Sequence, residues 1–394
     1  MQEENLPPPM GWNSWYCLSE SVSDETIRKT AAAMVERGLT GHGWTYINID
    51  DCWQGKRGGK YNALQGNERF PDMKGLCTYV HSLGLKLGIY STPWIASYAG
   101  FRGSSADQGY EKRYYLPESG RRQPNQVYAP CASPHLWRIG ADWLFPNDVA
   151  QWAEWGIDYV KMDWFPNDCP TVCRIAKELR SCGREIVLSL SNNADIKDAP
   201  ELMEYSNLVR ISADIHDTWE SIRDIGFFHD PRWHRLIRPG HWIDLDMLQV
   251  GAIGNPNQQN RSFRKSNLSY EEQKLQLSLW AVLSAPLLLT CDIAGMEDET
   301  FFLVTNDDII RVNQEMPAAP PVIRETEEPL KIYERLMKDG SVVTAYFNLG
   351  EELLPREINL PAPARDLWSK AIYPSGRNRI AIPPHGVIII RSTQ

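Results

Sequence analysis

Residues 155–163 read WGIDYVKMD, and the fold prediction starts from this stretch. Gly156 closes a helical run, and the apolar, β-rich residues that follow, 158–162, predict a short buried strand. Lys161 and Asp163 are two residues apart, so strand alternation places both side chains on the same face. The chain therefore passes from a helix into a buried strand and leaves two ionisable groups at the carboxyl end of that strand.

The same alternation of helix and strand recurs on both sides of this stretch. Strands are predicted at Met10–Trp15, Thr45–Ile49, Lys86–Tyr90, Asp158–Met162, Glu185–Leu190, Leu208–Ile211, His241–Leu245 and Pro286–Thr290. Helical patterns lie between them at Asp24–Arg37, Met73–Leu83, Asn147–Trp155, Thr171–Ser181 and Tyr270–Ala285. Eight strands alternating with helices, and no GxGxxG after the first strand, favour a parallel (β/α)8 barrel over a doubly wound open sheet.

The order of these patterns predicts two domains and one long insertion. Residues 1–315 form the barrel, and the polar, aromatic stretch 100–142 is a long loop after the third strand, on the carboxyl face of the barrel. Residues 316–329 read MPAAPPVIRETEEP, which indicates a linker. Only alternating runs remain in residues 330–394, and they predict a small antiparallel β-sandwich.

Composition limits the classes of partner. The net charge is -9 and no block of Lys or Arg occurs, so nucleic acid is not expected as a partner. No apolar run reaches about 18 residues, so no membrane span is expected. The eight Cys and eight His form no paired CxxC, HxxxH or HExxH motif, so we expect neither a metal site nor another cofactor. The 15 Trp and 16 Tyr residues suit stacking on sugar rings as well as core packing.

The N-terminus leaves the compartment open. MQEENLPPPM lacks a basic region followed by an apolar one, as in a signal peptide. A polar stub directly before a strand is typical of a mature chain whose signal has been removed. We therefore expect a secreted or periplasmic protein, with a cytoplasmic one as the competing hypothesis. The oligomeric state stays open, with a homodimer as one hypothesis.

Side chains at the carboxyl ends of barrel strands converge on one site. Here those positions carry Trp15, Asp50, Asp51, Tyr90, Lys161, Asp163, Ser191, Arg210, Asp214, Asp244, Asp246 and Asp292. Carboxylates and cations bind vicinal hydroxyls, and an aromatic ring accepts the apolar face of a sugar. Glycoside hydrolysis needs two carboxyl groups, one on each side of the bond. Taken singly, each Asp has a simpler explanation as a helix cap or a turn residue; the whole set favours a glycosidase.

The chain also resembles the α-galactosidase/α-N-acetylgalactosaminidase family (melibiases, glycoside hydrolase family 27) along nearly its whole length. The matching stretches are PPMGWNSW at 8–15, YINIDDCW at 46–53, HSLGLKLGIY at 81–90, WGIDYVKMD at 155–163, RISADIHDTW at 210–219, GHWIDLDML at 240–248, SLWAVLSAPLLLTCDI at 278–293 and NDDIIRVNQE at 306–315. The resemblance implies a barrel followed by a β-sandwich, and a retaining enzyme that releases terminal α-linked galactose.

The resemblance also implies the role of each site residue. The nucleophile is Asp163 and the general acid/base is Asp214. The substrate-binding residues are Trp15, Asp50, Asp51, Tyr90, Lys161, Ser191, Ala194, Arg210 and Asp246. Of these, Asp50 and Asp51 are expected to hold O4 and O6 of galactose. We further expect the Lys161 cation to keep Asp163 ionised, while Asp214 carries a proton in the resting enzyme.

The loop after the fifth strand bears on the substituent at C2. In the resembling α-galactosidases a Glu, and three residues later a Leu, face C2, whereas the acetylgalactosaminidases carry Ser and Ala. This chain has Ser191 and Ala194 at that spacing, with Asn192 and Asn193 in place of a Trp-Pro pair. An ordinary turn of small polar residues would explain the same letters. We expect a galactosidase first and an α-N-acetylgalactosaminidase second.

Two further departures concern the surroundings of the nucleophile. The cysteines that form a disulfide in animal members are Tyr98 and Phe165 here, and we expect their rings to touch beside the site. Aromatic residues of the long loop without an alignable counterpart are Trp94, Tyr110, Tyr114, Tyr115 and Trp137. The resemblance therefore leaves the leaving group undefined. A β-L-arabinopyranosidase, an isomaltose-releasing dextranase and an inactive glycan-binding barrel are competing hypotheses for the function.

Overall fold

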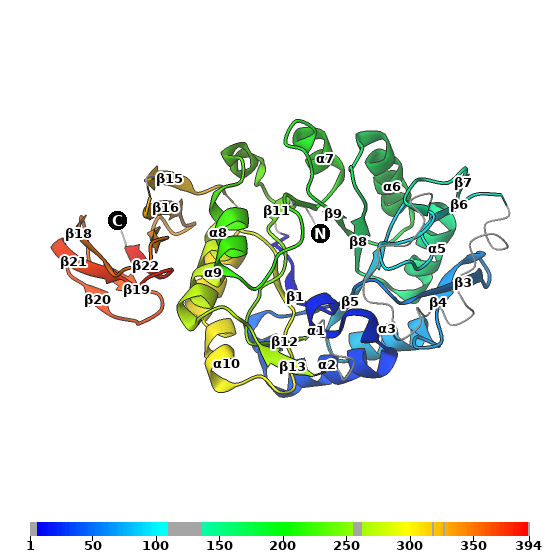
Figure 1. The fold of residues 1–394 in the computed structure, drawn as a ribbon, viewed down its shortest axis with the longest axis horizontal. Coiled ribbons are helices and arrows are strands. Elements are labelled where there is room, and N and C mark those ends of the chain that lie inside the picture. The colour runs from blue at the N-terminus through cyan, green and yellow to red at the C-terminus, as the bar shows by residue number, and fades with distance from the viewer. Residues whose placement is uncertain (1–5, 109–135, 255–261, 317–318, 326–327, 393–394) are drawn as a thin grey trace.

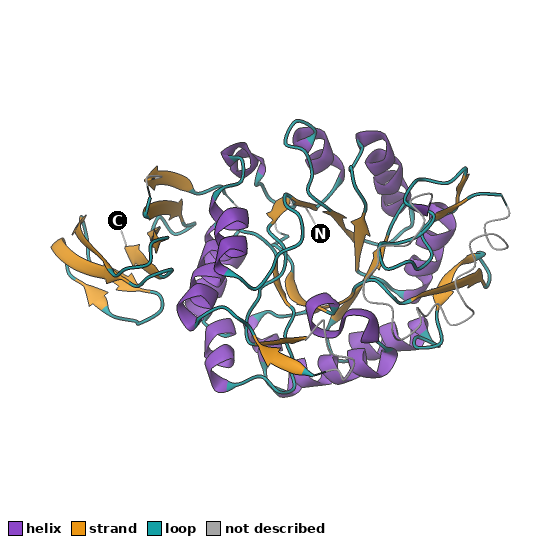
Figure 2. Ribbon diagram, in the orientation of Figure 1, coloured by secondary structure: helices purple, strands orange, loops and turns teal. Residues whose placement is uncertain are grey.

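The computed structural model describes residues 6–108, 136–254, 262–316, 319–325 and 328–392. Most of the chain forms one barrel with helices around its outside, and a smaller β-domain lies against one side of it (Figures 1 and 2). In the described residues no helix is long and apolar enough to cross a membrane. Seven cysteines lie in the same part of the chain, and all are free thiols.

The barrel sheet contains eight parallel strands, as predicted. They are β1 (Met10–Asn13), β2 (Tyr46–Ile49), β5 (Lys86–Ser91), β8 (Tyr159–Asp163), β9 (Val187–Ser191), β10 (Leu208–Arg210), β11 (Trp242–Asp244) and β14 (Leu287–Leu289). Their order is β11-β10-β9-β8-β5-β2-β1-β14. Leu248, which follows β11, bridges to Leu289 in parallel and connects the two edge strands. The (β/α)8 prediction is confirmed, with each predicted strand overlapping an observed one.

Helices accompany the sheet, and all but the four-residue α1, which lies at its carboxyl end, cover its outside. They are α1 (Trp15–Leu18), α2 (Asp24–Glu36), α3 (Met73–Ser82), α5 (Phe145–Trp155), α6 (Cys169–Ser181), α7 (Ala199–Tyr205), α8 (Trp219–Phe227), α9 (Tyr270–Val282), α10 (Asp298–Val304) and α11 (Asp307–Gln314). Capping residues set several starts: the Ser23 side chain accepts from the Thr26 N–H before α2, and the Thr218 side chain accepts from the Ser221 N–H before α8. Short 3-10 turns lie at Ser19–Ser21, Leu39–His42 and Pro231–Leu236.

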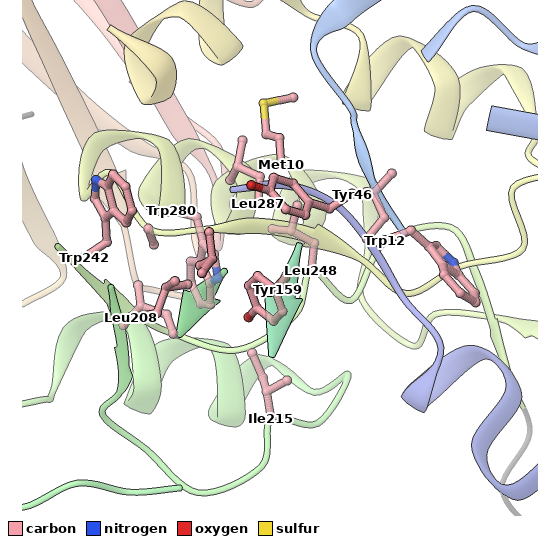
Figure 3. Packing of buried hydrophobic residues seen from close by; sticks show 14 of the residues in the cluster. Met10, Trp12, Tyr46, Tyr159, Leu208, Ile215, Trp242, Leu248, Trp280 and Leu287 are labelled. Carbon is pink, nitrogen blue, oxygen red and sulfur yellow. The ribbon is translucent and has the colours of Figure 1, made fainter. Parts of the chain in front are cut away.

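The barrel core lies mainly between the sheet and these helices. Met10 and Trp12 on β1 are buried there, together with Trp242 and Trp280 (Figure 3). Gly11 lies between Met10 and Trp12 on the other face of the strand, where a Cβ atom would come within 2.2 Å of the Tyr46 carbonyl oxygen on β2. Glycine is therefore required for the close pairing of these two strands.

In the described residues, three two-stranded antiparallel pairs extend from the barrel at its loops. They are β3 (Gln54–Gly58) with β4 (Ala63–Gly66), β6 (Ser105–Ala106) with β7 (Asp142–Trp143), and β12 (Ala252–Gly254) with β13 (Phe263–Lys265). The β6–β7 pair joins the two ends of the predicted insertion. Most of that insertion, including Tyr110, Tyr114 and Tyr115, lies outside the described residues.

The C-terminal domain is antiparallel, as expected. Its strands are β15 (Val322–Glu325), β16 (Leu330–Leu336), β17 (Val342–Asn348), β18 (Leu354–Leu360), β19 (Ala364–Asp366), β20 (Ile372–Tyr373), β21 (Gly376–Ile382) and β22 (Val387–Ser392). Six of them form one sheet, and β18 pairs with β21 in a second one that shares a buried cluster with the first. The predicted linker, 316–329, is more than a connection, because β15 within it joins the six-stranded sheet.

One hydrophobic cluster continues from the barrel into this domain. Phe347 on β17 contacts Phe227 on α8 with ring centroids 5.2 Å apart. Arg335, buried on β16, donates to Ser284 Oγ at 2.5 Å, and the Trp368 indole donates to Ser278 Oγ at 2.8 Å. The β-domain is therefore packed against α8 and α9, away from the strand ends that carry the predicted site.

Candidate active site

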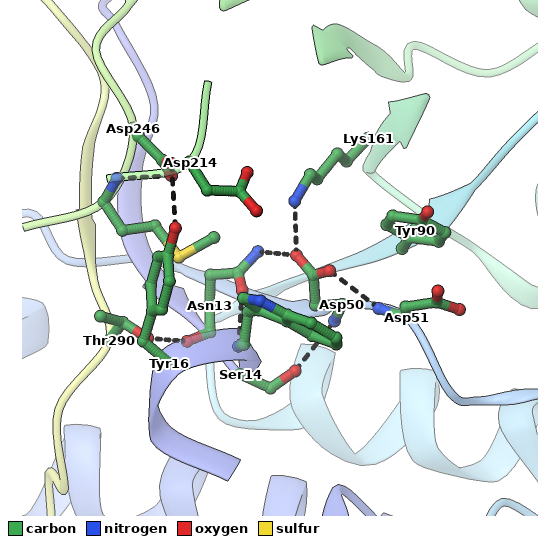
Figure 4. A network of polar contacts seen from close by, with 12 residues as sticks. Asn13, Ser14, Tyr16, Asp50, Asp51, Tyr90, Lys161, Asp214, Asp246 and Thr290 are labelled. Carbon is green, nitrogen blue, oxygen red and sulfur yellow. Dashed lines mark hydrogen bonds and ion pairs between the residues drawn. The ribbon is translucent and has the colours of Figure 1, made fainter. Parts of the chain in front are cut away.

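Asp50, directly after β2, accepts three hydrogen bonds at the carboxyl end of the barrel. Its Oδ2 accepts from Asn13 Nδ2 at 2.9 Å and from Lys161 Nζ at 2.9 Å. Its Oδ1 accepts from the Asp51 N–H at 2.9 Å, and the Asp50 N–H donates to Ser14 Oγ. Figure 4 shows Asp50 between Asn13 and Lys161. The ends of β1, β2 and β8 are thereby joined by one polar network.

Lys161 lies between carboxylates and an aromatic ring. Its Nζ is 5.5 Å from the centroid of the Tyr90 ring on β5, a cation–π contact. Burial alone lowers the pKa of Lys161, but the charges of Asp50 and Asp163 hold it above its ordinary value. Lys161 is therefore a fixed cation, suited to binding sugar hydroxyls rather than to proton transfer.

Three buried polar atoms around Asp163 have no hydrogen-bond partner. They are Asp163 Oδ1, Tyr90 Oη and Ser191 Oγ. Asp163 and Ser191 are register partners on β8 and β9, and Tyr90 pairs with Lys161 on β5 and β8. Buried polar groups in proteins almost always have partners, so three unpaired atoms at adjoining strand ends indicate a polar ligand.

The opposite side of the site is organised by Arg210, the last residue of β10. Its Nη2 donates to Asp214 Oδ1 at 2.6 Å and its Nη1 to Asp246 Oδ2 at 3.3 Å. Asp246 Oδ2 also accepts from Tyr16 Oη at 3.1 Å and from the Ile215 N–H at 3.0 Å. Asp246 is held at φ 71°, a left-handed conformation unusual outside glycine. Asp246 thus fixes Arg210 and the loop that carries Asp214.

The protonation of the two catalytic candidates differs from our expectation. Burial raises the pKa of Asp163, and the charges of Lys161 and Arg210, which lower it, only partly offset that effect. Burial also acts to raise the pKa of Asp214, but Arg210 and Lys161 bring it below its ordinary value. The prediction that Asp214 carries the resting proton is wrong for this arrangement, because Asp214 is half exposed and ion-paired with Arg210.

The Asp51 carboxylate is bonded to neighbouring protein groups, which was not expected of a residue that binds the sugar. Its Oδ1 accepts from the Cys52 N–H at 2.7 Å and from Gln54 Nε2 at 3.0 Å, and its Oδ2 accepts from the Ala99 N–H at 3.0 Å. Burial raises its pKa to about 6, although the hydrogen bonds from Ser97, Ala99 and Cys52 act to lower it. Asp51 therefore ties the loop after β5 to the end of β2, and its predicted contact with the sugar stays a prediction.

The other predicted residues lie at the expected strand ends. Trp15 is partly buried at the start of α1, where its N–H donates to Asn13 Oδ1 at 2.9 Å. Ala194 is buried in the loop after β9, with its N–H bonded to the Arg210 carbonyl at 3.1 Å. Asn193 before it has φ 46°, so the turn that replaces Trp-Pro has a left-handed residue.

The expected contact between Tyr98 and Phe165 is wrong. Tyr98 packs its ring against Trp94 and Trp137, with centroids 5.1 Å and 5.6 Å away. Phe165 is 52% exposed, and none of the ring contacts found among the described residues includes it. The Tyr98 ring packs on Trp94 and Trp137 instead, and Phe165 lies at the surface.

Sequence reasoning missed several groups of the network. Asn13 bonds Asp50, Tyr16 bonds Asp246, and Thr290 Oγ1 donates to the Asn13 carbonyl at 3.0 Å. Asn13 was identifiable, since it stands two residues before Trp15 at the end of a predicted strand. Tyr16 carried no such signal, because it lies on a four-residue helix that no pattern predicted.

Comparison with known proteins is consistent with this geometry. The family model described as "Alpha galactosidase A" matches residues 7–114 and 140–315. "Alpha-galactosidase 2" of Arabidopsis thaliana is 31% identical over 96% of this chain and 88% of its own length. The chain belongs to the α-galactosidase (melibiase) family. The family model has no match for 115–139, which lies within the predicted insertion.

Other members of the family include further activities. "Alpha-N-acetylgalactosaminidase" of Homo sapiens is 27% identical over 97% of this chain and 90% of its own length. Among solved structures, α-galactosidase I from Mortierella vinacea has a TM-score of 0.79 at 23% identity, covering 99% of each chain. A β-L-arabinopyranosidase from Geobacillus stearothermophilus reaches 0.78 at 24%, covering 100% of this chain and 97% of its own. At this identity the structures show the shared fold, so the glycone must be argued from the site.

Proposed function

We propose that this chain is a retaining glycoside hydrolase that releases terminal α-linked D-galactose from oligosaccharides or glycoconjugates. One observation carries the proposal: in a chain of the α-galactosidase family, Asp163 stands at the end of β8 with an unpaired, buried Oδ1, and Asp214 follows β10, two strands away in the same sheet. A buried carboxylate with a free oxygen is suited to attack on a carbon atom, because no proton donor of the protein blocks it.

The reaction proceeds by two displacements. Asp163 attacks the anomeric carbon and forms a glycosyl ester, while the leaving-group oxygen takes a proton from Asp214. Asp214 then removes a proton from water, which attacks the same carbon and releases Asp163. In the resting protein Asp214 is paired with Arg210. A bound substrate therefore has to weaken this ion pair before Asp214 can carry the proton that it donates.

The sugar is held by groups that keep free hydrogen-bonding capacity, since Asp50 accepts three hydrogen bonds of the about four that a carboxylate can take. Lys161 and Asp50 bind its vicinal hydroxyls, and Tyr90 donates from a phenol that has no protein partner. Trp15 supplies an apolar wall. Asp246 acts through Arg210 and Tyr16, since its two oxygens already accept four hydrogen bonds from the protein.

An α-N-acetylgalactosaminidase is the second candidate. The observation in its favour is the small pair Ser191 and Ala194, both buried, with Ser191 beside Asp163 in the strand register. A Glu at position 191 would fill the space that an acetamido group needs. This candidate differs from the first only at C2, and the rest of the site serves both.

A panel of nitrophenyl glycosides tests the proposal: α-galactoside, α-N-acetylgalactosaminide, β-L-arabinopyranoside and α-glucoside. We expect cleavage of the first or of the first two. Proton NMR of the earliest product must show the α-anomer of galactose, because two displacements retain the configuration. Preference for the arabinopyranoside or glucoside would point to an arabinopyranosidase or a dextranase, and binding without cleavage of any of them to an inactive barrel.

A further inference from the structure

Three aromatic rings form a cluster beside the catalytic end of β5. Trp94 and Trp137 are stacked, with centroids 6.2 Å apart and planes 21° apart, and Tyr98 contacts both. Trp94 is buried, whereas Trp137 is partly exposed. The indole Nε1 of Trp137 is buried and has no hydrogen-bond partner. A partly exposed indole ring beside an active site is suited to stacking on the apolar face of a ligand.

The backbone holds this cluster in place from two segments distant in sequence. Residues 136–139 return from the insertion and pair with the loop after β5: Ile95 N donates to the Arg138 carbonyl and Ala96 N to the Leu136 carbonyl, each at 3.1 Å. Asp51 fixes the next turn through the Ala99 N–H. Trp137 is thus held against Trp94 by paired backbone.

Tyr98 connects the cluster to the catalytic carboxylates. The pKa of its phenol is raised by burial and by the negative charges of Asp163 and Asp214, while Asn192 acts as a hydrogen-bond partner that lowers it. Tyr98 is therefore a neutral ring, and the hydrogen bond from the Ala99 N–H to Asp51 Oδ2 at 3.0 Å fixes the turn that carries it beside the strand ends of the site. Trp94 and Trp137 lie next to it, on residues outside the predicted galactose-binding set.

We propose that Tyr98, Trp94 and Trp137 form the subsite for the leaving group, and that this subsite binds a second pyranose ring. The inference rests on the proposed function and identifies the class of leaving group that the substrate carries. A pyranose has an apolar C–H face that can stack on the partly exposed Trp137 ring. Trp94 and Tyr98 lie in the part of the chain that the family model matches, whereas Trp137 lies in the unmatched residues 115–139, so Trp137 is the member of the subsite that the family at large does not share.

The test compares two substrates that share galactose and differ in leaving group. Melibiose carries glucose as its leaving group, whereas α-galactosyl fluoride has no second ring. For Trp137→Ala we expect kcat/KM on melibiose to fall on the order of tenfold, the scale of one lost ring contact with its buried area. On the fluoride the same variant should change kcat/KM by less than about twofold, because that substrate never reaches the Trp137 ring.

Two further variants serve as controls. Trp143→Ala removes an indole from the same returning segment, but that ring packs on Phe145 and under Arg174, so both substrates should be cleaved at the wild-type rate. Trp137→Phe keeps a ring and should recover part of the melibiose activity.

Each of the other outcomes would contradict the proposed subsite. An equal fall on both substrates would mean that Trp137 only supports the loop, and an unchanged rate on melibiose would mean that it binds nothing. A wild type that cleaves the fluoride but not melibiose contradicts the subsite alone. A wild type that cleaves neither contradicts the proposed function and the subsite with it.

Discussion

Arg210 donates from Nη2 to Oδ1 of Asp214 at 2.6 Å in the resting protein. The pair is i,i+4 in sequence, but it spans the end of β10 and the following loop rather than one helix. Arg210 is buried and Asp214 is half exposed, so the carboxylate is the partner that solvent and substrate can reach. The proton donor of the proposed reaction is thus held ionised until a substrate arrives.

The ion pair between Arg210 and Asp214 affects how activity depends on pH. The raised pKa of Asp163 means that the nucleophile loses its charge as the pH falls, and the lowered pKa of Asp214 means that the acid loses its proton well below neutral pH. We therefore expect kcat/KM on melibiose to be highest at acidic pH and to fall toward neutral and alkaline pH. α-Galactosyl fluoride needs no proton from Asp214, so its activity should persist to higher pH. Identical alkaline limbs for the two substrates would contradict the role of Asp214.

Azide rescue of alanine variants distinguishes the nucleophile from the acid/base, because the two variants should give galactosyl azides of opposite configuration. Asp214→Ala should lower turnover of melibiose by about 10²–10⁴-fold, the usual contribution of acid/base catalysis. Added azide should restore its turnover of nitrophenyl galactoside and yield α-galactosyl azide, because azide attacks the glycosyl-Asp163 ester. With Asp163→Ala, azide takes the place of the nucleophile and must yield the β-azide.

The product anomer is read by proton NMR. If Asp214→Ala gave the β-azide and Asp163→Ala the α-azide, Asp163 would be the acid/base and Asp214 the nucleophile. A wild-type rate in either variant would show that the substituted residue is not catalytic. A crystal structure should also place the nearest carboxyl oxygens of Asp163 and Asp214 about 5–5.5 Å apart, as retention requires.

A third prediction concerns stability. Arg57 on β3 and Asp148 on α5 form a buried bidentate pair, with Nη1–Oδ1 at 2.6 Å and Nη2–Oδ2 at 2.8 Å. Asp148 Oδ1 also accepts from the Leu64 N–H on β4. Removing one partner leaves a buried charge, so Arg57→Met should lower the free energy of unfolding by about 3–5 kcal/mol.

Arg57→Met/Asp148→Leu should be less destabilised than the sum of the two single variants, because it leaves no unpaired charge. Lys60→Met is the matched control: its pair with Glu154 is exposed and should contribute at most about 1 kcal/mol. Urea unfolding at neutral pH measures all four variants. Additive losses in the double variant would show that the two charges are not coupled.

The sequence was sufficient for the barrel, because each strand is a short apolar run that ends in a polar residue. Lys161 and Asp163 show why the site was also predictable. Side chains alternate between the two faces of a strand, so residues two apart at the end of β8 both point into the barrel. Tyr16 and the partners of Tyr98 were not predictable, since they depend on how separate loops meet. The pKa shifts of Asp163 and Asp214 also needed the structure, because they are set by burial and by the position of Arg210.

The last prediction addresses the substituent at C2. Ser191 ends β9 beside Asp163, its Oγ is buried without a partner, and Ala194 is buried three residues later. A galactose hydroxyl would leave this space partly unfilled, whereas an acetamido group can accept from Ser191 and lay its methyl over Ala194. We therefore expect the wild type to cleave nitrophenyl α-N-acetylgalactosaminide as well as the α-galactoside.

The double variant Ser191→Glu/Ala194→Leu should reverse that tolerance. The Glu supplies a hydrogen bond to the C2 hydroxyl, worth about 1–3 kcal/mol, so kcat/KM on the galactoside should rise by roughly 5- to 150-fold. Activity on the acetylgalactosaminide should be lost because the two larger side chains occupy its space. Asn192→Ala, which leaves both positions intact, is the control and should keep the ratio between the two substrates. A wild type that ignores the N-acetyl substrate, together with a double variant that gains nothing on galactose, would show that the left-handed turn at Asn193 directs these side chains away from the sugar.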